Sequence, residues 1–257
     1  MSGAADPARL LAPIRDLAAE AGAAILTHYR PNIAVRSKAD ASPVTAADEE
    51  AEAIILEGLG RLTPDIPIVS EEAFARGEIS SQAPWRFWLV DPLDGTKEFL
   101  KRNGEFTVNI ALIAHGRPLI GVVVAPALSQ AYGGTGPGSA WEWRNGIERA
   151  IAVRRPPAQG LTVVASRSHG DAAALDRWLG GRKVAETKQA GSSLKFCLLA
   201  AGEADLYPRF GRTMEWDTAA GHAVLAAAGG QVRTLAGEEL RYGKPGFENP
   251  HFIASTE

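Results

Sequence analysis

An apolar segment that runs directly into two carboxylates is the feature that most limits what this chain can fold into. Phe87-Trp88-Leu89-Val90 is followed at once by Asp91-Pro92-Leu93-Asp94-Gly95-Thr96. Four consecutive apolar side chains predict a short buried strand, and we expect this strand to stop at Asp91-Pro92. A strand that ends in a turn there can aim both carboxylates, and the carbonyl of Leu93 between them, at one point. Such a group of oxygens suits Mg²⁺, which prefers carboxylates, water and substrate phosphate as ligands.

Gly95 and Thr96 follow at the expected start of a helix. Free backbone N–H groups and the helix dipole favour a phosphate at that position. A purely conformational reading also exists, because Pro-Asp-Gly sequences occur in turns without any functional role. That reading explains Asp94-Gly95 but not Asp91, and it does not explain why so apolar a strand ends there.

Three further acids lie next to expected helices or strands. Glu71 follows the strand-like run Ile66–Val69 and is expected beside Asp91 in a sheet, although it also fits a solvated loop acid. Asp217 precedes a helix expected over 217–228, where Asp is common as an N-cap. Asp48 fits the end of a capping box that begins at Thr45. Each acid therefore has a structural alternative, and only together do they indicate a metal site.

The order of helix and strand patterns divides the chain into two parts. Helices are expected from Asp6-Pro7 to about residue 30 and over 45–59, hairpins over 106–125 and 141–153, a loop over 132–138, and a junction over 154–160. Beyond the junction we expect strands at 161–165, 184–188, 205–207 and 252–254, with helices at 171–179, 192–201 and 217–228. Residues 1–153 thus indicate an α+β half that carries most of the acids, and 154–257 an α/β half that contributes Asp217 and substrate contacts.

Composition limits the class of protein. The chain has 257 residues, 46 % of them hydrophobic, and a formal net charge of −3. That charge argues against a general nucleic-acid binder, which usually carries a basic excess. The sequence contains no run of 18 apolar residues, so no transmembrane segment is predicted. The single cysteine, Cys197, fits a cytoplasmic protein, and association with the inner face of the membrane or formation of a homo-oligomer stays open.

Taken together, these segments resemble the inositol monophosphatase superfamily of Mg²⁺-dependent, lithium-sensitive phosphatases. The resemblance spans nearly the whole chain: Lys38, Thr45-x-x-Asp48, Ser70-Glu71-Glu72, residues 91–96 and Trp216-Asp217-Thr218-Ala219-Ala220-Gly221. It implies a layered α-β-α-β-α sandwich with the metal site between the halves. It also implies that two or three Mg²⁺ ions are held by Glu71, Asp91, Asp94, Asp217 and the Leu93 carbonyl, while Asp48 and Thr96 orient and deprotonate the attacking water.

Within this superfamily the chain most resembles the bacterial 3'(2'),5'-bisphosphate nucleotidases of sulfate assimilation. The resemblance rests on Lys97-Glu98-Phe99, on residues 103–110 and on Ser166-Arg167-Ser168-His169. Where inositol monophosphatases usually carry a glutamate that binds the polyol, this chain has Arg209, which suits a second phosphate better. The substrate contacts implied are Gly95, Thr96, Ser166, His169, Lys195 and Arg209. Lys195 opposes the dipole of its own helix, which favours an anionic partner, whereas His169 alone also fits an ordinary surface residue.

The resemblance implies hydrolysis of the 3'-phosphate of adenosine 3',5'-bisphosphate to AMP and phosphate. The first alternative is a phosphatase of inositol or another sugar monophosphate that uses the same metal residues. A second alternative, from a different class, is a nucleotide-binding regulator without turnover. The presence of both Asp48 and Thr96 argues against that second alternative.

Overall fold

Most helices and strands lie where the sequence predicts them. The computed structural model describes residues 6–29, 35–37, 43–80, 82–166 and 172–257. Within these ranges the helices are α1 (Pro7–His28), α2 (Ala46–Leu62), α3 (Glu71–Ala75), α4 (Thr96–Lys101), α5 (Ala172–Leu179), α6 (Leu194–Ala200) and α7 (Ala219–Ala227), with 3₁₀ turns at Pro126–Leu128 and Pro245–Phe247. None of these helices is both long and apolar enough to cross a bilayer.

The strands of the described ranges form two large sheets and one small one. A seven-stranded sheet contains, in spatial order, β3 (Ile68–Ser70), β4 (Arg86–Asp94), β5 (Thr107–Ala114), β6 (Arg117–Ala125), β7 (Gln130–Gly134), β8 (Trp141–Arg144) and β9 (Ile147–Ala150). A five-stranded sheet contains β11 (Val184–Ala190), β10 (Leu161–Ser166), β12 (Leu206–Arg209), β14 (Phe252–Ser255) and β13 (Gln231–Thr234). The strands β1 (Val35–Ser37) and β2 (Pro43–Thr45) pair only with each other.

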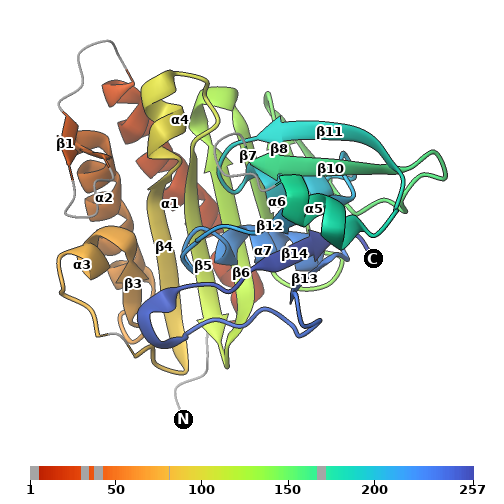
Figure 1. Cartoon of the computed structure of the whole chain (residues 1–257). Coiled ribbons are helices and arrows are strands. Elements are labelled where there is room, and N and C mark those ends of the chain that lie inside the picture. The colour runs from red at the N-terminus through yellow and green to blue at the C-terminus, as the bar shows by residue number, and fades with distance from the viewer. Residues whose placement is uncertain (1–5, 30–34, 38–42, 81, 167–171) are drawn as a thin grey trace.

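Helices cover these sheets in alternating layers (Figure 1). One buried cluster joins α1 and α2 to the larger sheet, a second joins that sheet through α6 and α7 to the smaller one, and a third lies between the smaller sheet and α5. The two large sheets thus bury apolar side chains against helices, which is the usual solution for mixed α/β proteins. The expected α-β-α-β-α sandwich is confirmed.

A regular N-cap and a continuous apolar face explain why α1 forms where the sequence predicts it. The side chain of Asp6 accepts a hydrogen bond from the Ala8 N–H at 3.1 Å, and proline occupies the next position. This is a regular N-cap with Pro at N1. Along α1 one face is buried, and it comprises Leu10, Ile14, Leu17, Ala18, Ala21, Gly22 and Ile25. These side chains pack on the outer face of the seven-stranded sheet.

The expectation that the strand from Phe87 stops at Asp91-Pro92 was wrong. β4 continues to Asp94, and its partner β5 pairs Asp91 with Asn109 and Asp94 with Thr107. Three steps along β4 thus match two along β5, which is a bulge with one extra residue. Pro92 has no N–H to donate and falls inside this bulge, where the ladder is already interrupted. The pairing on either side lets the strand run on, and the bulge bends the chain where both carboxylates occur.

A second expectation, a loop over residues 132–138, was wrong for residues 132–134, because β7 extends to Gly134, whereas residues 135–138 form the expected loop. Gly133 and Gly134 serve close packing rather than turning. A Cβ on Gly133 would lie 2.5 Å from the ring of Trp141, and one on Gly134 would lie 2.5 Å from the Cβ of Ala227 in α7. Glycine in a strand often marks such a close approach. The predicted turn at Asn145-Gly146 is confirmed, with φ of 52° and 87°.

Gly121 in β6 sets how closely α7 approaches the larger sheet. A Cβ there would lie 2.3 Å from the carbonyl oxygen of Ala220 and 2.6 Å from the Cβ of Ala223. Since backbone atoms cannot rotate away, we expect Gly121→Ala to destabilise the protein by about 3 kcal/mol. The melting temperature should fall by roughly 6–12 °C. Thermal unfolding checks this, with Gly60→Ala in α2 as the control, because nothing lies within 4 Å of that position. A Gly121→Ala protein that melts with the wild type would contradict this packing.

Candidate active site

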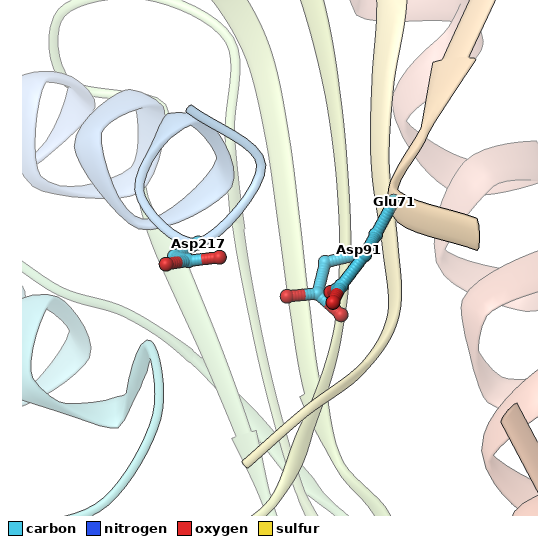
Figure 2. A group of neighbouring side chains, drawn as sticks. All are labelled: Glu71, Asp91 and Asp217. Carbon is cyan, nitrogen blue, oxygen red and sulfur yellow. The ribbon is translucent and has the colours of Figure 1, made fainter. Parts of the chain in front are cut away.

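Glu71 and Asp91 come together because the two strands that precede them are paired. β3 and β4 run parallel with Ser70 opposite Val90, so each acid is the next residue along its chain. Figure 2 shows the two carboxylates pointing toward the same space, with Asp217 facing them from the other side. One carboxylate oxygen from each of the three residues lies within 4.8 Å of the other two. The expected juxtaposition of Glu71 and Asp91 is therefore present.

The buried carboxylate of Glu52 fixes the chain around Glu71. It accepts hydrogen bonds from the Ser70 hydroxyl and from the Ala73 N–H, the latter at 3.1 Å. Its other oxygen lies 2.9 Å from the guanidinium of Arg76. Glu52 thus holds both ends of the first turn of α3, from which Glu71 projects. The sequence analysis did not find this residue, because a Glu inside an amphipathic helix gives no signal of such a role.

Asp217 does not act as the N-cap of α7. Thr218 occupies the cap position, and Asp217 instead accepts a hydrogen bond from the Met214 N–H at 2.9 Å. That bond ties the carboxylate to the preceding loop and leaves it beside Glu71 and Asp91. The structural alternative for Asp217 is therefore wrong. The capping alternative for Asp48 depends on the Thr45 side chain, which lies outside the described part of the structure.

Asp94 lines one cavity together with Glu71, Asp91 and Asp217, but it is not part of that three-residue group. The side-chain amide of Asn109 and the hydroxyl of Thr107 donate to its Oδ2 at 3.3 and 3.5 Å. Gly95 follows with φ of 90°, a left-handed conformation that favours glycine, and α4 begins at Thr96. The helix that the sequence predicts at this point is therefore present. The left-handed turn that begins it directly follows Asp94 in the chain.

The acids raise one another's pKa. Burial, then the charge of Glu71 and then that of Asp94, raises the pKa of Asp91 well above its usual value, and Asp217 and Asp48 add to this. Burial, Asp94 and Glu71 likewise raise the pKa of Asp217. Carboxylates taken out of water and placed this close repel one another unless a cation lies between them. The donor set therefore fits a hard divalent cation, and the acidic cluster can bind a metal.

A cavity of about 270 Å³ is lined both by these acids and by the cations Lys195, Arg209 and Arg212, which form its cationic wall. The full lining comprises Glu71, Asp91, Leu93, Asp94, Gly95, Thr96 and Asp217 together with Ser166, Gly191, Ser192, Lys195, Tyr207, Arg209, Arg212 and Thr213, and with Lys97, Glu98, Phe196 and Thr218. The acids come from β4, α3 and the start of α7, whereas the cations come from α6, from β12 and from the segment after β12.

The two buried cations of this wall are held differently. Lys195 is 6 % exposed, its ammonium donates to the Ser192 carbonyl at 2.6 Å, and it lies 5.3 Å from the ring centre of Tyr207. Burial lowers its pKa to about 8, although the charge of Asp94 opposes that shift. Arg209 is 8 % exposed and donates to the Arg212 carbonyl at 2.8 Å, while its Nε has no partner within the described chain. A buried cation with an unused donor is suited to bind an anion.

Of the other predicted site residues, some line the cavity, one lies near it, and others fall outside the described ranges. Ser166 and Thr96 line the cavity. Asp48 is 2 % exposed and close enough for its charge to raise the pKa of Asp91, but it is not among the lining residues. Lys38 and His169 lie outside the described ranges.

The sequence analysis missed Ser193, whose hydroxyl accepts from Asn109 at 3.0 Å and donates to the Asp217 carbonyl at 2.8 Å. Asn109 was missed as well, and it links this serine to Asp94. Neither residue type signals such a bridge, because the contact joins segments that are far apart in the chain.

Comparison with known proteins gives consistent results. The family model described as "Inositol monophosphatase family" matches residues 6–256. The 3'(2'),5'-bisphosphate nucleotidase CysQ of Escherichia coli K12 is 52 % identical over 253 residues, which cover 96 % of this chain and 99 % of that protein. The protein of the same name from Buchnera aphidicola is 45 % identical over 254 residues, with 96 % and 94 % covered.

Solved structures show the same architecture. The crystal structure of CysQ from Bacteroides thetaiotaomicron, a bacterial member of the inositol monophosphatase family, superposes with a TM-score of 0.81 at 36 % identity and covers 98 % of this chain and 99 % of that one. The IMPase of Thermotoga maritima has a TM-score of 0.77 at 24 % identity, with 96 % and 92 % covered, and supports the fold alone. Since the family model spans almost the whole sequence and the fold agrees, this chain belongs to the inositol monophosphatase family.

Proposed function

We propose that this protein is a Mg²⁺-dependent phosphomonoesterase that hydrolyses the 3'-phosphate of adenosine 3',5'-bisphosphate to AMP and inorganic phosphate. The observation that carries this proposal is a single cavity lined both by clustered carboxylates and by buried cations. The carboxylates suit a metal-bound phosphate, and the cations suit a second phosphate. The relatives at 52 % identity that bear the name of this activity support the same substrate.

Glu71, Asp91, Asp94, Asp217 and the carbonyl of Leu93 would hold two or three Mg²⁺ ions. When bound, the ions supply positive charge that neutralises the phosphate and the developing charge on the leaving oxygen. The chain itself fixes the direction of these ligands. The Leu93 N–H donates to Asp91 Oδ1 at 3.1 Å, so one carboxylate oxygen is held in the bulge.

Asp48 and Thr96 would position the attacking water, and Asp48 would accept its proton. Water then adds to phosphorus as the bond to the ribose 3'-oxygen breaks, and that oxygen takes up a proton from solvent to give the hydroxyl of AMP, with no covalent enzyme intermediate. The N–H groups of Gly95 and Thr96 would donate to the phosphate oxygens, because they follow the bulge at the start of α4. Asp48 suits this role because it is buried beside the acid cluster.

Lys195 and Arg209 would bind the 5'-phosphate, and Ser166 and His169 would contact the nucleotide. The support for Lys195 and Arg209 is that both are buried and line the same cavity as the acids. Ser166 lines the same cavity, whereas His169 rests on the sequence alone. A charge-assisted hydrogen bond to phosphate is typically worth ~1.5–3 kcal/mol, and each ~1.4 kcal/mol is a factor of ten.

We therefore expect kcat/KM for adenosine 3',5'-bisphosphate to exceed that for inositol 1-phosphate by at least about tenfold. Arg209→Glu and Lys195→Ala should lower use of the bisphosphate much more than use of the monophosphate. The measurement is steady-state phosphate release with both substrates and fructose 1,6-bisphosphate. Arg117→Ala is the matched control, because that arginine is exposed and pairs with Glu239.

The same panel separates the alternatives. A wild-type enzyme that prefers inositol 1-phosphate would replace this proposal with the sugar-monophosphatase one. A protein that releases no phosphate from any of the three compounds would indicate a regulator without turnover. Equal slowing of both substrates by the Lys195 and Arg209 variants would show that these cations do not bind the second phosphate.

A further inference from the structure

The turn formed by Gly191 and Ser192 lies between β11 and α6 and lines the cavity. Ser192 has φ of 49°, a left-handed conformation that is unfavourable for residues with a Cβ. Such a conformation persists when the surrounding structure holds it, and it often occurs at functional sites. Specific contacts with the rest of the molecule must therefore hold this turn at the edge of the cavity.

Those contacts come from the other half of the molecule. The carboxylate of Glu105 accepts a hydrogen bond from the Gly191 N–H at 2.8 Å. The Ser192 hydroxyl lies 2.7 Å from the carbonyl oxygen of Glu105 and 2.9 Å from that of Asp94. A Cβ on Gly191 would lie 2.8 Å from the same Glu105 carbonyl. The turn is thus held tightly against the segment that connects Asp94 to β5.

The same turn holds the ammonium group of the cationic wall. Lys195 donates to the Ser192 carbonyl at 2.6 Å, and to the Ala190 carbonyl at a longer 3.5 Å. Two hydrogen bonds, joined by the backbone of the turn, therefore connect the Glu105 carboxylate to the Lys195 ammonium. Glu105 itself is not among the residues that line the cavity, so it acts from behind the turn.

We infer that Glu105 is a positioning residue, which holds the Gly191-Ser192 turn and thereby places the Lys195 ammonium for the second anionic group of the substrate. This inference rests on the proposed function in one respect, namely that Lys195 receives a phosphate. It explains why a carboxylate of the first half accepts a hydrogen bond from a backbone N–H in a turn of the second half. It also gives the left-handed Ser192 a role in substrate recognition.

The test uses variants of Glu105 in two backgrounds. In the wild-type background Glu105→Ala should raise KM for adenosine 3',5'-bisphosphate by about tenfold, the equivalent of one charge-assisted contact, with a much smaller change in kcat. In a Lys195→Met background the same substitution should leave KM unchanged, because the cation that it places is gone. Glu105→Gln keeps an acceptor for the Gly191 N–H and should recover most of the loss. Glu57→Ala, on the exposed face of α2, controls for removal of a negative charge.

Binding of AMP, measured by calorimetry, separates this inference from the proposed function. Glu105→Ala should weaken AMP binding by about the same factor of ten, whether or not the enzyme turns over the bisphosphate. A wild type that binds AMP in this Glu105-dependent way but releases no phosphate would refute the proposed function and keep the inference. Unchanged AMP affinity in Glu105→Ala, no AMP binding by the wild type, or an equal KM effect in the Lys195→Met background would each overturn the inference.

Discussion

Replacing Asp91 by asparagine should lower kcat by about a thousandfold and leave the fold intact. Asp91 lies at the centre of the acid cluster, with an oxygen within 4.8 Å of both Glu71 and Asp217. Loss of its charge should cost several kcal/mol of transition-state stabilisation, and each ~1.4 kcal/mol is a factor of ten in rate. The amide is nearly the same size, and its oxygen can still accept from the Leu93 N–H.

Although Asp91→Asn should lose activity, its thermal stability without metal should not fall. Burial and four neighbouring carboxylates raise the pKa of Asp91, so its negative charge destabilises the metal-free protein. We therefore expect metal-free Asp91→Asn to melt at or above the wild-type temperature. Phosphate release and thermal unfolding test the two parts, with the exposed Asp65→Asn as the control for an acid-to-amide change. Near-normal turnover by Asp91→Asn would remove Asp91 from the metal site.

Removing divalent metal should abolish activity in the wild type, and Mg²⁺ should restore it fully. Because the metal-free cluster is self-repulsive, Mg²⁺ should also stabilise the fold. At a concentration of about 100 times its Kd, a bound ion contributes ~2.7 kcal/mol. In a protein of this size that corresponds to a rise in melting temperature of roughly 5–10 °C.

Treatment with a chelator, followed by dialysis and titration with Mg²⁺, measures both effects on one sample. Asp91→Asn is the informative comparison here, because its melting temperature should respond far less to Mg²⁺. Ca²⁺ provides a second comparison, since it prefers more ligands and longer bonds than Mg²⁺. Full activity that persists after exhaustive chelation would contradict a metal-dependent mechanism.

Local patterns in the sequence predicted much of the fold. The Asp6-Pro7 start of α1 and the turn at Asn145-Gly146 depend on neighbours in the chain, and both are confirmed. The failures have a common physical cause. Gly133 and Gly134 looked like loop residues, yet they are glycine because Trp141 and α7 come close to them. A bulge opposite β5 likewise carries β4 past Pro92. Contacts between distant segments decided both cases.

The residues of the site also fall into those that the sequence could place and those that it could not. Glu71 and Asp91 could be placed together from the sequence because each directly follows a strand and those strands pair. Asp217 lies more than a hundred residues further on, and no local pattern places it beside them, so its position rested on the combined acidic residues and on the family resemblance. Ser192 and Glu105 gave no signal, because a serine in a left-handed turn and a carboxylate behind it become meaningful only when two halves of the protein meet.

The two walls of the cavity have a consequence for the synthesis of this protein. A ribosome completes β3 and β4 early, but it must translate more than a hundred further residues before Lys195, Arg209 and Asp217 exist. The nascent N-terminal half therefore presents clustered acids with neither the opposing cations nor the last carboxylate. Since chains fold progressively as they emerge, that half begins to fold with an incomplete site. Under the proposed function the metal site is complete only with Asp217, so activity would appear only after the chain up to that residue has been synthesised and has packed onto the first half.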